Sequence, residues 1–136
     1  MPGTTRNIDQ LRAAHAWKAV EAAASLRDTK DYAREAKRLP VRIKVSGLGS
    51  SIAFVNAKSG DGKAGGALLK DLCDWLVNER RMSGATTDKP SGSALIVAIV
   101  NGDARLLRRM TEEALSYLQW LTRFAEAEIG VDEDAA

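Results

Sequence analysis

Two glycine-rich segments have residue types and spacing that suggest phosphate chemistry. In GLGSSI, Gly47 and Gly49 follow the alternating segment VRIKV, an order also found in dinucleotide-binding loops. Ile52 stands where that fingerprint has its third glycine, and no β-α-β pattern surrounds the segment. In AKSGDGKA, Ala57 and Ala64 replace the first glycine and the hydroxyl of a P-loop. Neither segment predicts a nucleotide site, and GLG instead predicts a tight turn between helices.

The candidate nucleophiles, acids and bases form no recognisable catalytic set. His15 is the only histidine and Cys73 the only cysteine, which excludes a metal site built from several such residues. We expect His15 on a helix face and Cys73 as a small apolar residue of an amphipathic helix. The pair Glu112–Glu113 follows Arg108–Arg109 by four residues, a spacing typical of surface ion pairs. The sequence therefore predicts no catalytic residue, no cofactor and no metal.

Helices must position whatever site exists. The chain has 136 residues, 45% of them hydrophobic and 5% aromatic, which favours one all-α domain. VRIKV alternates like a strand, but no clear partner strand exists, so we interpret it as helical up to Gly47. Pro40 predicts a kink or a restart within the second helix. Helices are predicted over residues 7–26, from about 28 to 46, 48–58, 67–81, 94–100 and 103–129.

These ranges predict a single-domain bundle of about five to six helices with a long C-terminal helix. Residues 1–6 and 130–136 are expected to be flexible tails, and residues 59–66 and 83–93 to be loops. The single cysteine and the absence of a signal or membrane-spanning pattern predict a cytoplasmic protein with no membrane partner.

Positive charge is concentrated in the first part of the chain. Residues 1–81 hold 15 Lys and Arg against 9 Asp and Glu, whereas residues 82–136 hold 5 against 9. The positive charges are densest around Glu35, at Arg34, Lys37, Arg38, Arg42 and Lys44. Such a cluster suits phosphate binding, although a solvated helix face would look the same. These observations leave a nucleic-acid-binding module and a scaffold subunit as the two open interpretations.

Several segments in order along the chain resemble one known family. They are QLRAAHAWKAV, YAREAKRLPVRIKVSGLGSSIAFVNAKSG, LLKDLCDWL and LIVAIVNGDARLLRRMTEEALSYLQWLTRFAEAEI, and together they cover most of the chain. This order resembles the small subunit of the type III-B CRISPR effector, the Cmr RNA-silencing complex. The resemblance implies a non-catalytic all-α subunit. In several copies it would form a minor filament beside the backbone subunit and line the groove for target RNA.

The resemblance also implies partners and candidate contacts. The partners would be further copies of the chain, the backbone, large and capping subunits, guide RNA and target RNA. A groove that accepts any target must bind phosphates and leave sequence reading to base pairing. The first candidates for phosphate contacts are Lys37, Arg38, Arg42 and Lys44. The second candidates are Arg12 and Lys18 on the first helix and Arg108 and Arg109 on the last.

The alternative function is a helix-turn-helix type DNA-binding regulator. Residues 34–58 would supply its two helices around the GLG turn. The segment SIAFVNA is largely apolar, whereas a recognition helix presents polar side chains to base edges. A small enzyme that uses His15 or Cys73 is a third interpretation.

Overall fold

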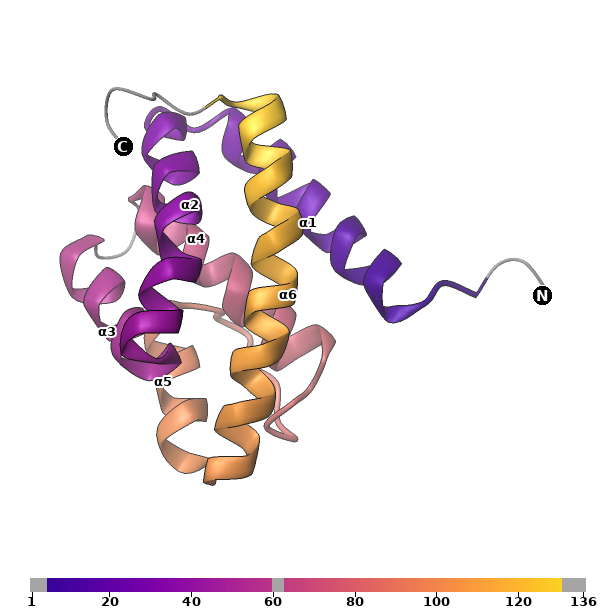
Figure 1. Ribbon diagram of the computed structural model, residues 1–136, viewed down its shortest axis with the longest axis vertical. Coiled ribbons are helices and arrows are strands. Elements are labelled where there is room, and N and C mark those ends of the chain that lie inside the picture. The colour runs from indigo at the N-terminus through magenta and orange to yellow at the C-terminus, as the bar shows by residue number, and fades with distance from the viewer. Residues whose placement is uncertain (1–4, 60–62, 131–136) are drawn as a thin grey trace.

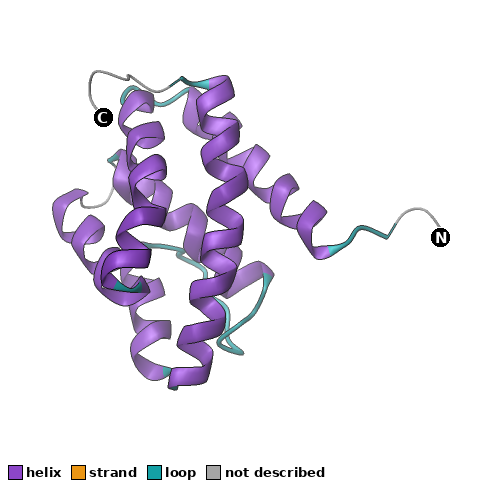
Figure 2. Ribbon diagram, viewed as in Figure 1, coloured by secondary structure: helices purple, strands orange, loops and turns teal. Residues whose placement is uncertain are grey.

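The computed structural model describes residues 5–59 and 63–130, and every regular element within them is a helix (Figures 1 and 2). Six α-helices and one π-helix follow in the order α1 (Ile8–Ala24), α2 (Thr29–Ser46), α3 (Leu48–Ser59), α4 (Ala64–Cys73), η1 (Asp74–Glu79), α5 (Gly92–Asn101) and α6 (Ala104–Glu128). The all-α class and the long C-terminal helix are thus confirmed. Most of the two expected tails and the middle of the first expected loop lie outside the described residues.

Side-chain caps fix the starts of several helices. Asn7 accepts a hydrogen bond from the Gln10 amide at 2.8 Å and the Gln10 side chain accepts from the Asn7 amide at 2.9 Å, which is a capping box. Asp103 caps α6 in the simpler way by accepting from Leu106. Asp28, expected to start the second helix, makes no side-chain cap there and accepts from the Ala64 amide at 2.9 Å. It thereby ties the start of α4 to the α1–α2 turn.

Of the kink or restart predicted at Pro40, the restart is absent, because α2 is one α-helix from Thr29 to Ser46. Its end is set by Gly47, whose φ of 87° and ψ of 162° lie in a region that favours glycine. A single residue therefore separates α2 from α3, and Ser51 donates to the Gly47 carbonyl at 2.7 Å. The GLG segment is a helix-to-helix turn, as the sequence predicted.

The predicted helix over residues 67–81 differs from the observed one at both ends. The observed helix begins at Ala64, so the first loop is shorter than expected. It changes from α to π geometry at Asp74 and ends at Glu79. The Arg80 amide donates to the Trp75 carbonyl at 2.9 Å, five residues back. The consecutive residues Trp75, Leu76 and Val77 of this segment are all buried. The second loop ends two residues earlier than predicted, since α5 begins at Gly92.

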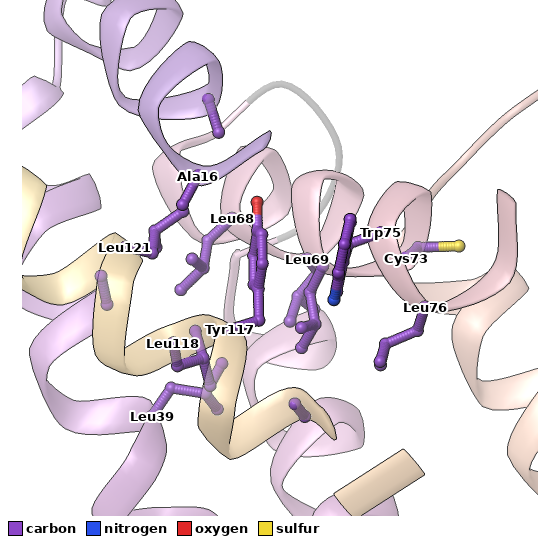
Figure 3. Close-up of a cluster of buried hydrophobic side chains, with 14 of the residues drawn as sticks. Ala16, Leu39, Leu68, Leu69, Cys73, Trp75, Leu76, Tyr117, Leu118 and Leu121 are labelled. Carbon is purple, nitrogen blue, oxygen red and sulfur yellow. The ribbon is translucent and has the colours of Figure 1, made fainter. Parts of the chain in front are cut away.

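One cluster of buried side chains includes residues from every helix. Figure 1 shows α2 and α6 side by side, with α1 crossing behind α6 and α4 lying behind α2. Tyr117 of α6 stacks on Trp75 with ring centroids 5.5 Å apart and an interplanar angle of 14° (Figure 3). Cys73 is fully buried beside them and acts as the apolar residue that the sequence predicted. With its core on one side, α2 presents its other side to solvent.

Candidate nucleic-acid interface

The basic residues of α2 form two rows on its solvent-facing side. A rotation of 100° per residue places Arg34, Arg38 and Arg42 along one edge and Lys37 and Lys44 along the other. The first row borders α3, because the Arg42 guanidinium carbon lies 4.4 Å from the ring centroid of Phe54. The second row borders α6, because Lys44 and Arg123 line the same groove between the two helices. All four first-choice residues therefore lie on one helix, along opposite edges of its solvent-facing side.

Arg42 has a guanidinium that is held against an aromatic ring and has no carboxylate partner among the described residues. Its Nε atom is buried and has no hydrogen-bond partner among the described residues. Within residues 5–59 and 63–130, no carboxylate lies within 4.0 Å of its guanidinium. Contact with the Phe54 ring holds the side chain in position without neutralising its charge. The arrangement leaves a positioned cation without an anion in this part of the chain.

Two neighbouring cations are already paired. Arg34 donates to Asp31 at 2.6 Å, and Lys58 of α3 donates to Glu35 at 2.6 Å. Glu35 is 6% exposed, so the single acidic residue of the cluster is turned inward. The outward charge of this face is consequently carried by α2 itself. Lys37 and Lys44 are exposed, and Arg38 and Arg42 are partly buried.

Arg12 is engaged inside the molecule. Its Nε and Nη2 atoms donate to the two carboxylate oxygens of Glu113 at 2.5 and 3.0 Å. The hydrogen bond to Glu113 raises the pKa of Arg12 above its ordinary value. Burial acts to raise the pKa of Glu113, but hydrogen bonds from Arg12 and Trp75 outweigh burial and lower it. Arg12 therefore joins α1 to α6. The expected ion pair between Arg109 and Glu113 is not formed, because Glu113 pairs with Arg12.

The other second-choice residues lie apart from α2. Lys18 lines a cleft of about 520 Å³ between α1 and the α4–η1 segment. Arg108 and Arg109 are exposed near the start of α6. Neither forms the ion pair with Glu112 or Glu113 that their spacing predicted, and Glu113 instead pairs with Arg12 and Arg80. The structure thus brings the first-choice set together and leaves the second-choice set dispersed.

A second polar cluster lies where α1 meets η1 and α6. His15 has Nδ1 at 2.7 Å from the Tyr117 hydroxyl and Nε2 at 2.8 Å from Asp74. Both ring nitrogens are occupied, so His15 links three helices and is more than the helix-face residue expected. Nearby, Tyr32 donates to Asp71 at 2.7 Å. Burial is the main cause that raises the pKa of Asp71 to about 6, against the lowering effect of the Tyr32 hydrogen bond.

Phe54 is the member of this surface that the sequence interpretation missed. It is 51% exposed and lies between Arg42 and Lys58, whose Nζ atom is 5.9 Å from the ring centroid. The sequence signal was an aromatic residue four positions before a lysine, on a helix adjoining the basic one.

Among the described residues, no three His, Cys, Asp or Glu side chains are grouped to hold a metal ion. Nor does any helix there combine the length and apolar character that a membrane span requires.

Comparison with known proteins agrees with the sequence resemblance. The family model described as "CRISPR-associated protein (Cas_Cmr5)" matches residues 8–128. The fold is similar to the crystal structure of a CRISPR-associated Cmr5 family protein from Thermus thermophilus, with a TM-score of 0.76 and 28% sequence identity. The alignment covers 92% of this chain and 99% of the Thermus chain.

Proposed function

The chain belongs to the CRISPR-associated Cmr5 family and is a subunit of a type III-B CRISPR effector complex, and we propose that it has a non-catalytic, RNA-binding role there. Several copies form a minor filament that lines the groove for target RNA, and the α2 face contacts RNA phosphates. As one domain it acts with the other subunits in the cytoplasm. The observation that carries this proposal is the positioned, unneutralised Arg42 on a helix face that also bears Lys37 and Lys44.

This charge arrangement suits a groove that must accept any RNA sequence. Side chains that act as point charges on a rigid helix bind the phosphate backbone and leave base identity to pairing with the guide. Asp31 and Glu35 are the acidic side chains of α2, and each is paired with a cation. The face consequently attracts a polyanion without building a site for one particular base.

The test is a charge-removal variant with a matched control. Lys37, Arg42 and Lys44 are changed to Gln, which keeps much of each side chain's length, and partly buried Arg38 is left unchanged to limit disturbance of the fold. The control changes three exposed lysines on α4 and nearby loops to Gln, namely Lys63, Lys70 and Lys89. Each variant is assembled into the effector complex, and capture of target RNA is measured at a series of salt concentrations from about 50 to about 300 mM.

We expect the α2 variant to assemble normally, to bind target RNA more weakly, and to lose roughly 2 units of the slope of log affinity against log salt. The control should keep both affinity and slope. Equal behaviour of the two variants would contradict the role of the α2 face. A gel shift with duplex DNA tests the regulator alternative, because tight sequence-specific DNA binding by the chain alone would favour that function.

A further inference from the structure

We propose that Phe54 is a stacking platform for an unpaired base of single-stranded RNA, and that Arg42 binds the phosphate beside that base. This proposal rests on the RNA-binding function proposed above and deepens it. It adds a contact between Phe54 and an RNA base to this surface, for which the sequence predicted only phosphate contacts. The contact is insensitive to sequence, because every base has a flat aromatic face.

The position of Phe54 needs an explanation, because it is a large aromatic side chain on the solvent-facing side of α3, where Ala53, Ala57 and Lys58 are also exposed. Ile52 and Val55 have no exposed surface, while Phe54 is 51% exposed. A large aromatic side chain left half in water gives up much of the free energy available from burial. Two cations lie near the ring, with the Arg42 guanidinium carbon at 4.4 Å and Lys58 Nζ at 5.9 Å from its centroid.

An exposed aromatic ring beside a guanidinium matches the two components of a nucleotide. A base stacks on an aromatic ring or on a guanidinium plane, and the phosphate pairs with the guanidinium. Lys58 is already paired with Glu35, so Arg42 is the cation that lacks an anion within the described part of the chain. Stacking requires a base free of its partner strand, so the ligand is single-stranded RNA and not a continuous duplex.

A protein partner is the competing occupant of this surface. Val41 and Val45 on α2 are 63% and 79% exposed, and together with Phe54 they could contact an apolar segment. Such a partner would also bury Arg42, and would have to supply a carboxylate to avoid leaving that charge unpaired. RNA supplies the anion and the flat ring in the same molecule. We therefore assign the surface to RNA and make protein docking an outcome of the test.

The experiment compares two single-stranded probes of the same length. One is an RNA of about 12 nucleotides, within the range that single-strand-binding sites cover, and the other is the corresponding ribose-phosphate chain without bases. Binding is measured at low salt with the full-length chain and with the assembled complex. The variants are Phe54→Leu, which keeps apolar volume but removes the aromatic ring, Phe54→Tyr, which keeps the ring, and Val45→Ala as the control for lost apolar surface.

We expect Phe54→Leu to lower affinity for the RNA about fivefold or more. Affinity for the abasic chain should fall less, because Arg42 loses the ring that positions it but keeps its charge, and the salt slope should be unchanged. An equal loss of affinity for both probes would contradict the stacking contact. Phe54→Tyr and Val45→Ala should bind both probes as the wild type does. Equal affinity of wild type and Phe54→Leu for the RNA overturns the proposal. So does a joint loss of complex assembly in Phe54→Leu and Val45→Ala, which would identify a protein contact.

The outcome also separates this proposal from the proposed function. If the α2 charge variant weakens RNA binding but Phe54→Leu does not, the phosphate contacts stand and the stacking contact fails. If neither change affects binding by the chain or by the complex, both proposals fail.

Discussion

The Thr122 hydroxyl of α6 donates a hydrogen bond at 3.1 Å to the Ala36 carbonyl of α2. In an uninterrupted α-helix that carbonyl would accept from the amide of residue 40, but Pro40 has no amide hydrogen. A side chain from a neighbouring helix thus satisfies the group that proline leaves unpaired. This contact explains how α2 passes through Pro40 inside the bundle.

Replacing Thr122 with Val should lower the free energy of unfolding by about 1 kcal/mol, because the change keeps the side chain's shape and removes the donor. In a Pro40→Ala background the helix regains its own hydrogen bond, so the same replacement should cost less. Urea unfolding of the four proteins in this double-mutant cycle measures the coupling. Strictly additive effects would show that the Thr122 hydroxyl does not substitute for the missing amide.

The two glycines of the GLG turn should respond in opposite directions to replacement by Ala. Gly47 has φ +87°, and a Cβ added there would have no described atom within 4 Å, so Gly47→Ala costs only backbone strain, about 1–3 kcal/mol. Gly49 is inside α3 and its added Cβ would lie 3.5 Å from Ile99, an ordinary contact. Gly49→Ala should therefore be neutral or stabilise by up to about 1 kcal/mol. Thermal unfolding of both variants checks the pair, and equal destabilisation would contradict this account.

Most of the fold followed from local patterns. Apolar spacing, caps and glycine breaks placed the helices within a few residues, since those signals depend on neighbouring residues in the sequence. The π geometry of η1 was not predicted. Residues of η1 also contact segments outside the helix, since the Asn78 side-chain amide donates to the Thr87 carbonyl and accepts from the Thr87 backbone amide. The cap that Asp28 provides for α4 has the same non-local origin.

The candidate site was predictable in part for the same reason. Helical spacing placed Lys37, Arg38, Arg42 and Lys44 on one surface, because they share a helix. The inward pairing of Arg12 with Glu113 was missed, since the two residues are 101 positions apart. Local spacing instead assigned Glu113 to Arg109. The contact between Arg42 and Phe54 was missed because the crossing of α2 and α3 cannot be read from either segment alone.

Glu113 should be among the most sensitive acidic residues of the chain. It is 6% exposed and accepts hydrogen bonds from Arg12 and from Trp75 Nε1, the latter at 3.1 Å. Glu113→Gln leaves Arg12 with only the more exposed carboxylate of Asp9, at 3.3 Å, so we expect a loss of about 2–4 kcal/mol in the free energy of unfolding. Exposed Glu112 is the matched control, and its change to Gln should cost less than about 0.5 kcal/mol. Similar urea midpoints for the two variants would contradict the structural role of Glu113.

Asp71 should make the protein less stable as the pH rises from about 4 to about 6. Burial raises the pKa of Asp71 to about 6, above its usual 3.8, so in this range the folded state holds a proton that the unfolded state releases. Asp71→Asn removes the ionisation and keeps an oxygen that can accept from Tyr32. The free energy of unfolding of this variant, relative to that of the wild type, should rise by about 2 kcal/mol between about pH 4 and about pH 7.

Asp74 provides a control of opposite sign for that pH dependence. Burial acts to raise its pKa, but hydrogen bonds with His15 and Asn78 outweigh burial and lower the pKa below its ordinary value. The ionised form of Asp74 therefore stabilises the fold above the unfolded pKa, and that contribution is lost as the pH falls through the lower folded value. Asp74→Asn should accordingly destabilise the protein at about pH 7, where Asp71→Asn stabilises it. Urea unfolding of both variants and the wild type at steps of one pH unit from about 4 to about 7 measures the contrast, and a pH-independent difference between Asp71→Asn and wild type would refute the assignment to Asp71.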